Sequence, residues 1–274
     1  MKLSRRAGRR SGSDDAPAVT RFLRVTASIV SVELSKLRRD PSELVTRSVQ
    51  PALWLLVFGQ VFGKLHAVPT GTVDYFTFLT PGILAQSVLF IAIFYGISVI
   101  WERDLGILQK LLASPAPRSA LVSGKALSAG IRALAQGLII YLLATFMHVP
   151  LDLSPVALAG VVAAILLGAA LFSTFSLMVA CLVKTRERFM GIGQVLTMPL
   201  FFASNAIYPI TIMPDWLKVV ARVNPLTYQV DLLRTLMIRG GMSSFGIATD
   251  LAVLSSALVL LVLLTAKLYP SIVR

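Results

Sequence analysis

The chain has a single cysteine and only two histidines among its 274 residues. One cysteine, Cys181, excludes an internal disulfide and a cysteine-based metal site. The histidines, His66 and His148, lie far apart near the predicted ends of apolar segments. We interpret them as interfacial residues rather than metal ligands. The sequence also has no histidine–carboxylate cluster or nucleophile motif that would indicate an enzyme.

A phosphate-binding loop of the form G-x-x-x-x-G-K-[ST] is missing too. Gly124 and Lys125 are followed by Ala126, and no glycine stands five residues before Gly124. We therefore expect this chain to bind no nucleotide and no other cofactor. If ATP supplies energy, it has to do so through a separate subunit.

Charged residues are scarce. Only 14% of the residues are charged and 56% are hydrophobic, and the mean hydropathy is +0.79. Because a soluble protein has about 25% charged residues, this composition indicates a polytopic membrane protein in the lipid bilayer. The net charge of +13 comes from basic residues between the apolar runs. We attribute it to the positive-inside bias and expect no nucleic-acid partner.

The chain does have apolar runs close to the roughly 20 residues that a crossing helix needs. We predict an all-α membrane protein with six transmembrane helices, near residues 44–62, 81–100, 127–147, 155–183, 189–207 and 250–269. The first is the weakest, because Arg47 lies near its start, although Asp40 and Glu43 form a helix-start signal. Ser154 and Pro155 mark the start of the fourth span.

Lysine and arginine are concentrated in the segments on one side of these spans. This asymmetry predicts that both termini are cytoplasmic. Residues 1–19 are predicted to be a disordered basic tail, residues 20–39 an amphipathic helix in the membrane interface, and residues 40–274 the transmembrane domain. Glu33 falls on the apolar side of the amphipathic helix, either as a snorkelling carboxylate or as a contact to a partner.

A charged, amphipathic segment lies between the second and third spans. It carries charges at its start and leucines at helical spacing, and the residues that we assign to it are Glu102, Arg103, Asp104, Gly106, Leu108 and Leu112. The spacing predicts a short helix on the cytoplasmic surface that docks a partner. The alternative is a solvated loop with ordinary flanking charges.

A proline-broken segment lies between the fifth and sixth spans. The residues that we assign to it are Pro209, Pro214, Trp216, Asn224, Pro225 and Tyr228. Pro214 is predicted to open a short helix that Trp216 packs onto the ends of the spans, and Asn224 to cap a second helix. Broken backbone at membrane depth needs a cover of protein or a water-filled cavity. The helix pair is therefore a candidate outer gate, with an extracellular hairpin that has no transport role as the alternative.

Two further features concern helix packing inside the membrane. Arg132 stands inside the third span, where an ion either has a functional role or snorkels to the interface. Gly160, Ala164 and Gly168 recur at a spacing of four, which predicts close helix packing in lipid. The same spacing is compatible with a dimer.

These segments, in this order, resemble the membrane subunit of type-2 ABC exporters, and among them the daunorubicin-resistance-type drug permeases. The matching residues are Glu102-Arg103-Asp104 with Gly106, Leu111-Leu112, Ser114-Pro115, Gly124-Lys125, Pro209, Pro214, Trp216-Leu217, the run Asn224 to Tyr228, Asp231 and Leu233-Arg234. The resemblance covers nearly the whole chain after Thr20. Asp104, Ile107 and Gln109 depart from the glutamate, threonine and glutamate that are common in the family.

The resemblance implies a permease subunit that exports an amphipathic small molecule, drug or lipid, with multidrug efflux and antibiotic resistance as the role. It also implies a homodimer or related heterodimer and a cytoplasmic ABC ATPase subunit that holds ATP and magnesium. Residues 20–39 and 102–112 would be the connecting and coupling helices. A permease for polysaccharide or lipid-linked glycan is the alternative within the class.

A partner-independent channel or a secondary transporter is the alternative from another class. It is disfavoured because the predicted spans carry almost no acidic residue that could couple ions, and because no inverted repeat is visible.

Overall fold

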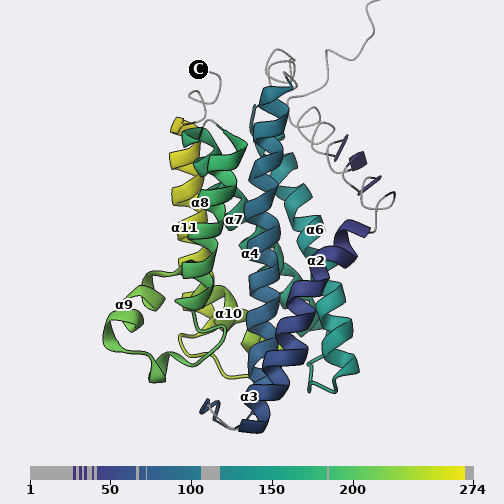
Figure 1. The fold of residues 1–274 in the computed structure, drawn as a ribbon, viewed down its shortest axis with the longest axis vertical. Coiled ribbons are helices and arrows are strands. Elements are labelled where there is room, and N and C mark those ends of the chain that lie inside the picture. Colours follow the sequence, from purple (N-terminus) through teal and green to yellow (C-terminus); the bar gives the residue numbers. More distant parts are fainter. Residues whose placement is uncertain are drawn as a thin grey trace, which may run out of the picture.

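The computed structural model describes residues 27–28, 31–32, 34–35, 39, 42–65, 68–71, 73–105, 118–183 and 185–268. These residues are predominantly helical and form a bundle of long helices (Figure 1). The described ranges contain no strand, only an isolated antiparallel bridge between Leu151 and Ile238. The all-α prediction is therefore confirmed.

Among the described residues, four helices contain a stretch that is long and apolar enough to cross a membrane. They are α4 (Tyr75–Asp104), α6 (Arg118–Phe146), α7 (Pro155–Leu182) and α11 (Ile247–Leu268). The apolar stretch of α4 is 89% buried inside the chain, whereas that of α11 is only 11% buried. Helix α4 is therefore the centre of the bundle, packed by α6, α7, α8 and α10, and α11 leaves most of its apolar surface exposed.

Helix α4 begins before the predicted span, and Pro81 lies inside it rather than at its start. Asp74 provides the start signal, because its carboxylate accepts hydrogen bonds from the amide (3.2 Å) and the hydroxyl (2.5 Å) of Thr77. Helix α6 likewise begins at Arg118, ahead of its apolar part. The apolar runs thus marked the centres of these helices and not their first turns.

The first predicted span is helical but is built from three consecutive parts. Helix α2 (Ser42–Leu53) leads into a π-helical stretch, η1 (Trp54–Gly59), and then into α3 (Gln60–Leu65). Pro51 lies inside α2, where it removes an amide from the helical hydrogen-bond ladder. The π-helical stretch begins three residues after this proline.

The fifth predicted span is wrong at its end. Helix α8 (Arg186–Phe202) has 17 residues, and residues 204–207, which we predicted to be helical, form a turn. This turn is covered by protein, because a side chain at Gly82 would come within 2.3 Å of the Ala206 carbonyl oxygen. An apolar run can therefore continue past a helix when the turn that follows is buried.

The predicted amphipathic helix at residues 20–39 lies largely outside the described residues. Those that are described are helical. The Ser31 hydroxyl donates to the Ser28 carbonyl (2.9 Å), and the Ser35 hydroxyl donates to the Ser31 carbonyl (2.8 Å). The basic tail at residues 1–19 lies outside the described residues.

Candidate functional site

The proline-broken segment forms two short helices, α9 (Asp215–Val223) and α10 (Pro225–Met237). A single 3-10 turn, Ile210–Ile212, precedes them and follows directly after Pro209. Pro214 is the residue before α9, as predicted. Figure 1 shows α10 within the end of the bundle and α9 set to one side of it. We call this end of the bundle the α10 end. The opposite end is the one where α4 and α11 finish.

Asn224 connects α10 to the end of α8. Its side-chain oxygen accepts a hydrogen bond from the Leu226 amide (3.0 Å), which is the predicted cap with Pro225 in the first turn. Its side-chain amide donates to the carbonyls of Leu200 (2.7 Å) and Ala203 (3.1 Å). One side chain thus both starts α10 and satisfies carbonyls that the last turn of α8 leaves without a helical partner.

Tyr228 fixes the corner between α9 and α10. Its hydroxyl donates to the Arg222 carbonyl at 2.6 Å, and its ring lies 4.9 Å from the ring of Phe245. The Tyr228 side chain therefore holds the end of α9, the start of α10 and the loop before α11 together.

Two buried carboxylates lie beneath that loop. Asp231 on α10 accepts hydrogen bonds from the Ser243 hydroxyl (2.7 Å) and from the amides of Ser244 (2.8 Å) and Phe245 (3.1 Å). The Ser243 hydroxyl also lies 3.4 Å from the carboxylate of Asp250 at the start of α11. Both residues are fully buried, although Asp231 lies on α10 outside the predicted spans and Asp250 stands in the first turn of α11.

Helix α10 also packs closely against α7. The Gln229 side chain lies directly against Gly168, where an added Cβ would come within 2.0 Å of its amide nitrogen. Gly160 meets Leu236 of α10 in the same way, at 3.1 Å. The small residues of α7 thus allow close packing, as predicted, and their partner is α10.

Trp216 does not pack onto the ends of the spans. In the described chain its side chain is 69% exposed, and Val219 and Val223 on the same helix are also exposed. Lys218 and Asp215 form an ion pair at 3.0 Å on α9. Trp216, Val219 and Val223 therefore face away from this chain, which corrects the packing prediction for Trp216.

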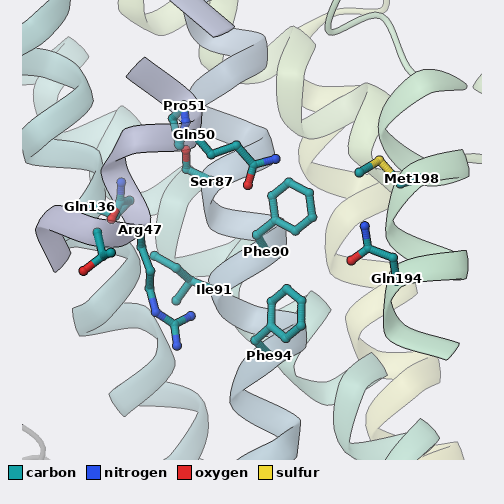
Figure 2. A pocket seen from close by; sticks show the side chains of 11 residues that line it. Arg47, Gln50, Pro51, Ser87, Phe90, Ile91, Phe94, Gln136, Gln194 and Met198 are labelled. Carbon is teal, nitrogen blue, oxygen red and sulfur yellow. The ribbon is translucent and has the colours of Figure 1, made fainter. Parts of the chain in front are cut away.

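A second feature is a cavity of about 230 Å³ between α2, α4, α6 and α8. Figure 2 shows Phe90 and Phe94 of α4 side by side in it, facing α8. Their rings are stacked, with centroids 6.3 Å apart. The other lining residues are Thr46, Arg47, Gln50, Pro51, Ser87, Ile91, Gln136, Gln194 and Met198. The cavity therefore combines a flat aromatic wall with several polar groups.

A hydrogen bond between two helices supports one side of this cavity. The Gln136 side chain of α6 donates to the Ser48 hydroxyl of α2 at 2.9 Å, and both residues are buried. Arg132 lies one turn before Gln136, half-buried and inside the candidate span of α6. Its position inside a span is as predicted, and its role stays open.

At the opposite end, the last turn of α4 is joined to the first turn of α8. The Arg186 guanidinium bonds to the Asp104 carboxylate at 3.0 Å and lies 3.8 Å above the ring of Trp101. Glu102, Arg103 and Asp104 belong to α4 itself and do not begin a separate helix, because α4 continues unbroken to Asp104. Gly106, Leu108 and Leu112 lie outside the described residues.

Several residues of these sites escaped the sequence analysis. Gln136 and Gln194 are single polar residues within apolar runs, and a polar residue at a predicted buried position was the signal that could have found them. Phe90 and Phe94 stand four apart on α4, but their spacing alone does not separate a cavity wall from ordinary core packing.

Comparison with known proteins gives the family. A family model described as ABC-2 type transporter matches residues 25–238. The protein ycf38 of Cyanophora paradoxa, assigned as a transport permease, is 29% identical over 231 residues, covering 83% of this chain and 79% of the relative. The daunorubicin resistance ABC transporter permease protein DrrB1 of Streptomyces coeruleorubidus is 26% identical over 256 residues, covering 89% and 87%. The inner membrane transport permease YadH of Escherichia coli (strain K12) is 23% identical over 197 residues, covering 70% and 73%.

The matched residues run from the segment before α2 to the end of α10 and so include Asn224, the aromatic cavity and the junction of α4 with α8. The resemblance inferred from the sequence is thereby confirmed: the chain belongs to the ABC-2 type transporter family.

Proposed function

We propose that this chain is the permease subunit of an ATP-driven exporter that moves an amphipathic small molecule, drug or lipid out of the cell. The observation that carries the proposal is the cavity between α2, α4, α6 and α8, in a chain of the ABC-2 family. Phe90 and Phe94 offer an aromatic surface, and Arg47, Gln50 and Gln194 offer polar groups. A molecule with a flat apolar part and a polar part matches both.

The proposed topology has six crossings in a prokaryotic plasma membrane. Helices α4, α6, α7 and α11 supply four, and α8 and the continuous helix of α2, η1 and α3 supply the other two. In this topology the α10 end is outside the cell and both termini are cytoplasmic. The α9–α10 pair is then the outer gate, with Asn224 at its hinge.

A second copy of the permease is proposed to cover the exposed face of the first crossing. Val45, Val49, Leu53, Val57 and Val61 recur every four residues there, and each is about half exposed. Such a stripe on one helix face matches a helix–helix contact. Because α2 also lines the cavity, the dimer would bring two such cavities towards a common path.

Energy is proposed to come from a cytoplasmic ABC ATPase subunit, which would hold ATP and magnesium. The docking segment would be residues 102–112, which begin in the last turn of α4. The contacts of Arg186 with Asp104 and Trp101 would pass a displacement of this segment to α8. Helix α8 in turn reaches the gate through the hydrogen bonds of Asn224.

The cavity favours a discrete molecule over a polymer. Its volume of about 230 Å³ is close to the lower limit of ordinary small-molecule sites, whereas a glycan chain needs a continuous path.

The buried Asp231 and Asp250 are the groups that a secondary transporter would use. Asp231, however, is bonded to three groups of the Ser243–Phe245 loop, which indicates a structural role.

Transport of daunorubicin, which the name of one relative suggests as a probe, tests this proposal. The chain is co-expressed with a candidate ABC ATPase subunit from the same organism, and ATP-dependent uptake into inverted membrane vesicles is measured. Phe90→Ala and Phe94→Ala should each raise KM by up to about tenfold, because an aromatic pair contributes about 0.5–1.5 kcal/mol. Purified alone, the chain should hydrolyse no ATP.

Phe146→Ala is the matched control, because Phe146 lies on α6 away from the cavity and is 79% exposed. It should leave KM unchanged. The cavity assignment fails if the two cavity variants transport daunorubicin with the wild-type KM. The whole proposal fails if the ATPase subunit hydrolyses ATP at the same rate with and without this chain.

A further inference from the structure

Arg234 on α10 is a buried cation with incomplete hydrogen bonding. The residue is 9% exposed, and its guanidinium carbon lies 3.8 Å above the centroid of the Phe78 ring. One terminal nitrogen, Nη2, donates to the carbonyls of Asn205 (2.8 Å) and Phe78 (3.4 Å). The buried Nε has no acceptor in the part of the chain that the structure describes.

No carboxylate oxygen of the described residues comes within 4.0 Å of this guanidinium. Asp231 stands one turn earlier on α10, but the hydrogen bonds to its carboxylate come from the Ser243–Phe245 loop. Burial lowers the pKa of Arg234 to about 10, and nearby Asp231 counteracts this effect. The guanidinium is therefore still protonated at neutral pH.

A buried charge without a partner is costly, and proteins normally pair such a charge or give it a bound counter-ion. The aromatic ring and the two carbonyls supply part of the compensation. They carry no net negative charge, so the charge of Arg234 stays unbalanced at close range.

A cavity of about 330 Å³ adjoins Arg234 at the α10 end. Its wall includes Thr70, Thr77, Gly240, Gly241 and Ser244. Gly241 allows the loop after α10 to lie close to the α10 backbone, because a Cβ there would lie 2.4 Å from the Arg234 carbonyl oxygen. This volume falls within the range of ordinary small-molecule sites, and, apart from Arg234, the lining residues belong to the segment before α4, the first turn of α4 and the segment after α10, at the end of the bundle.

We propose that Arg234 and this cavity form a binding site for a phosphate-type oxyanion. The anion is either free phosphate or the phosphate of a phospholipid headgroup. A guanidinium recognises phosphate through parallel charge-assisted hydrogen bonds, and a bound anion supplies the charged acceptor that no described carboxylate places within 4.0 Å of the guanidinium. The position of the cavity where the spans end places it at the level of lipid headgroups.

The test measures binding without ATP or transport, so its result is independent of the proposed function. The full-length chain is purified in detergent, and its Tm is compared in inorganic phosphate and in chloride at equal ionic strength. It is then compared in detergent micelles that contain phosphatidylglycerol and in micelles that contain a galactosyl diacylglycerol, which has no phosphate. We expect phosphate or phosphatidylglycerol to raise Tm by about 3 °C. The shift should be absent in Arg234→Gln and retained in Arg239→Gln, an exposed arginine of the same segment.

A shift with inorganic phosphate identifies a free anion, and a shift with phosphatidylglycerol alone identifies the headgroup. Both results support the site. If neither probe raises Tm, or if the shift persists in Arg234→Gln, the site does not exist. Should Arg234→Gln fail to fold, Thr70→Trp fills the cavity from its other wall and leaves the guanidinium in place. Retention of the shift in that variant would equally overturn the proposal.

Discussion

At the residue scale, the Asn224 side chain caps one helix and connects it to a second helix. Its oxygen caps α10 and its nitrogen holds the last turn of α8. Aspartate is as good a capping residue as asparagine, but it cannot donate to the two carbonyls. Substitutions at this position can therefore separate capping from the connection to α8.

We predict that Asn224→Asp destabilises the chain at least as much as Asn224→Ala. Loss of the cap in the alanine variant costs about 1 kcal/mol, and the lost bonds to Leu200 and Ala203 add about 1–3 kcal/mol. The aspartate keeps the cap but places a buried carboxylate against two carbonyl oxygens. Thermal unfolding in detergent measures the effect, with Val223→Ala, at a 78% exposed position, as the control. Wild-type stability of Asn224→Asp would show that only the cap matters.

The cap itself could be predicted because its signal is local. An asparagine followed by proline marks a helix start whatever surrounds it. The bonds of Asn224 to α8 could not be predicted, since they join residues 24 and 21 positions apart. Trp216 was placed wrongly because apolar character was taken to mean burial in the same chain. In a membrane protein such a face can be covered by lipid or by a second chain instead.

At the scale of elements, the packing of α7 against α10 depends on the size of two residues. Gly168 has no side chain, and Gln229 occupies the space that one would fill. The sequence spacing of small residues predicted a close contact, but it did not identify the partner helix. That partner is a short helix whose position follows from the turns on both sides of it.

Gly168→Ala should therefore destabilise the chain by about 1–3 kcal/mol, the usual cost of overpacking. The added Cβ would lie 2.0 Å from the Gln229 amide nitrogen, so the end of this fully buried side chain would have to turn aside into its packed surroundings. The double variant Gly168→Ala with Gln229→Ala should recover much of the loss in thermal unfolding experiments. Gly191→Ala is the control, because nothing lies within 4 Å of a Cβ added there. Equal stability of Gly168→Ala and wild type would rule out this contact.

Helix ends were the least predictable part of the elements. Apolar runs located the middle of α4, α6, α7 and α11, but α4 extends to Asp74 because that carboxylate caps it. Helix α8 ends at Phe202, before the end of the predicted span, because the residues that follow form a buried turn. In both cases the deciding contact lies outside the apolar run.

At the scale of the whole molecule, the two ends of the bundle differ in chemistry. The α10 end holds buried polar residues that hydrogen-bond within the chain: Asn224, Asp231 and Arg234. At the opposite end, Arg186 contacts Asp104 and Trp101. These two residues of α4 shortly precede residues 106–112 in the sequence. The bias of lysine and arginine predicts that the opposite end is cytoplasmic, and labelling of single cysteines tests this prediction.

Leu153→Cys, in the loop between α6 and α7, should react in intact cells with a membrane-impermeant thiol reagent. Leu182→Cys, at the far end of α7, should react only after the membrane is made permeable. Both positions are more than half exposed in this chain, at 52% and 64%, so a difference in labelling reports the side of the membrane and not burial. Native Cys181 is 9% exposed and is replaced by alanine in both variants to remove any background. Labelling of Leu182→Cys in intact cells, with protection of Leu153→Cys, would invert the orientation and place the α9–α10 pair in the cytoplasm, where it could not be an outer gate.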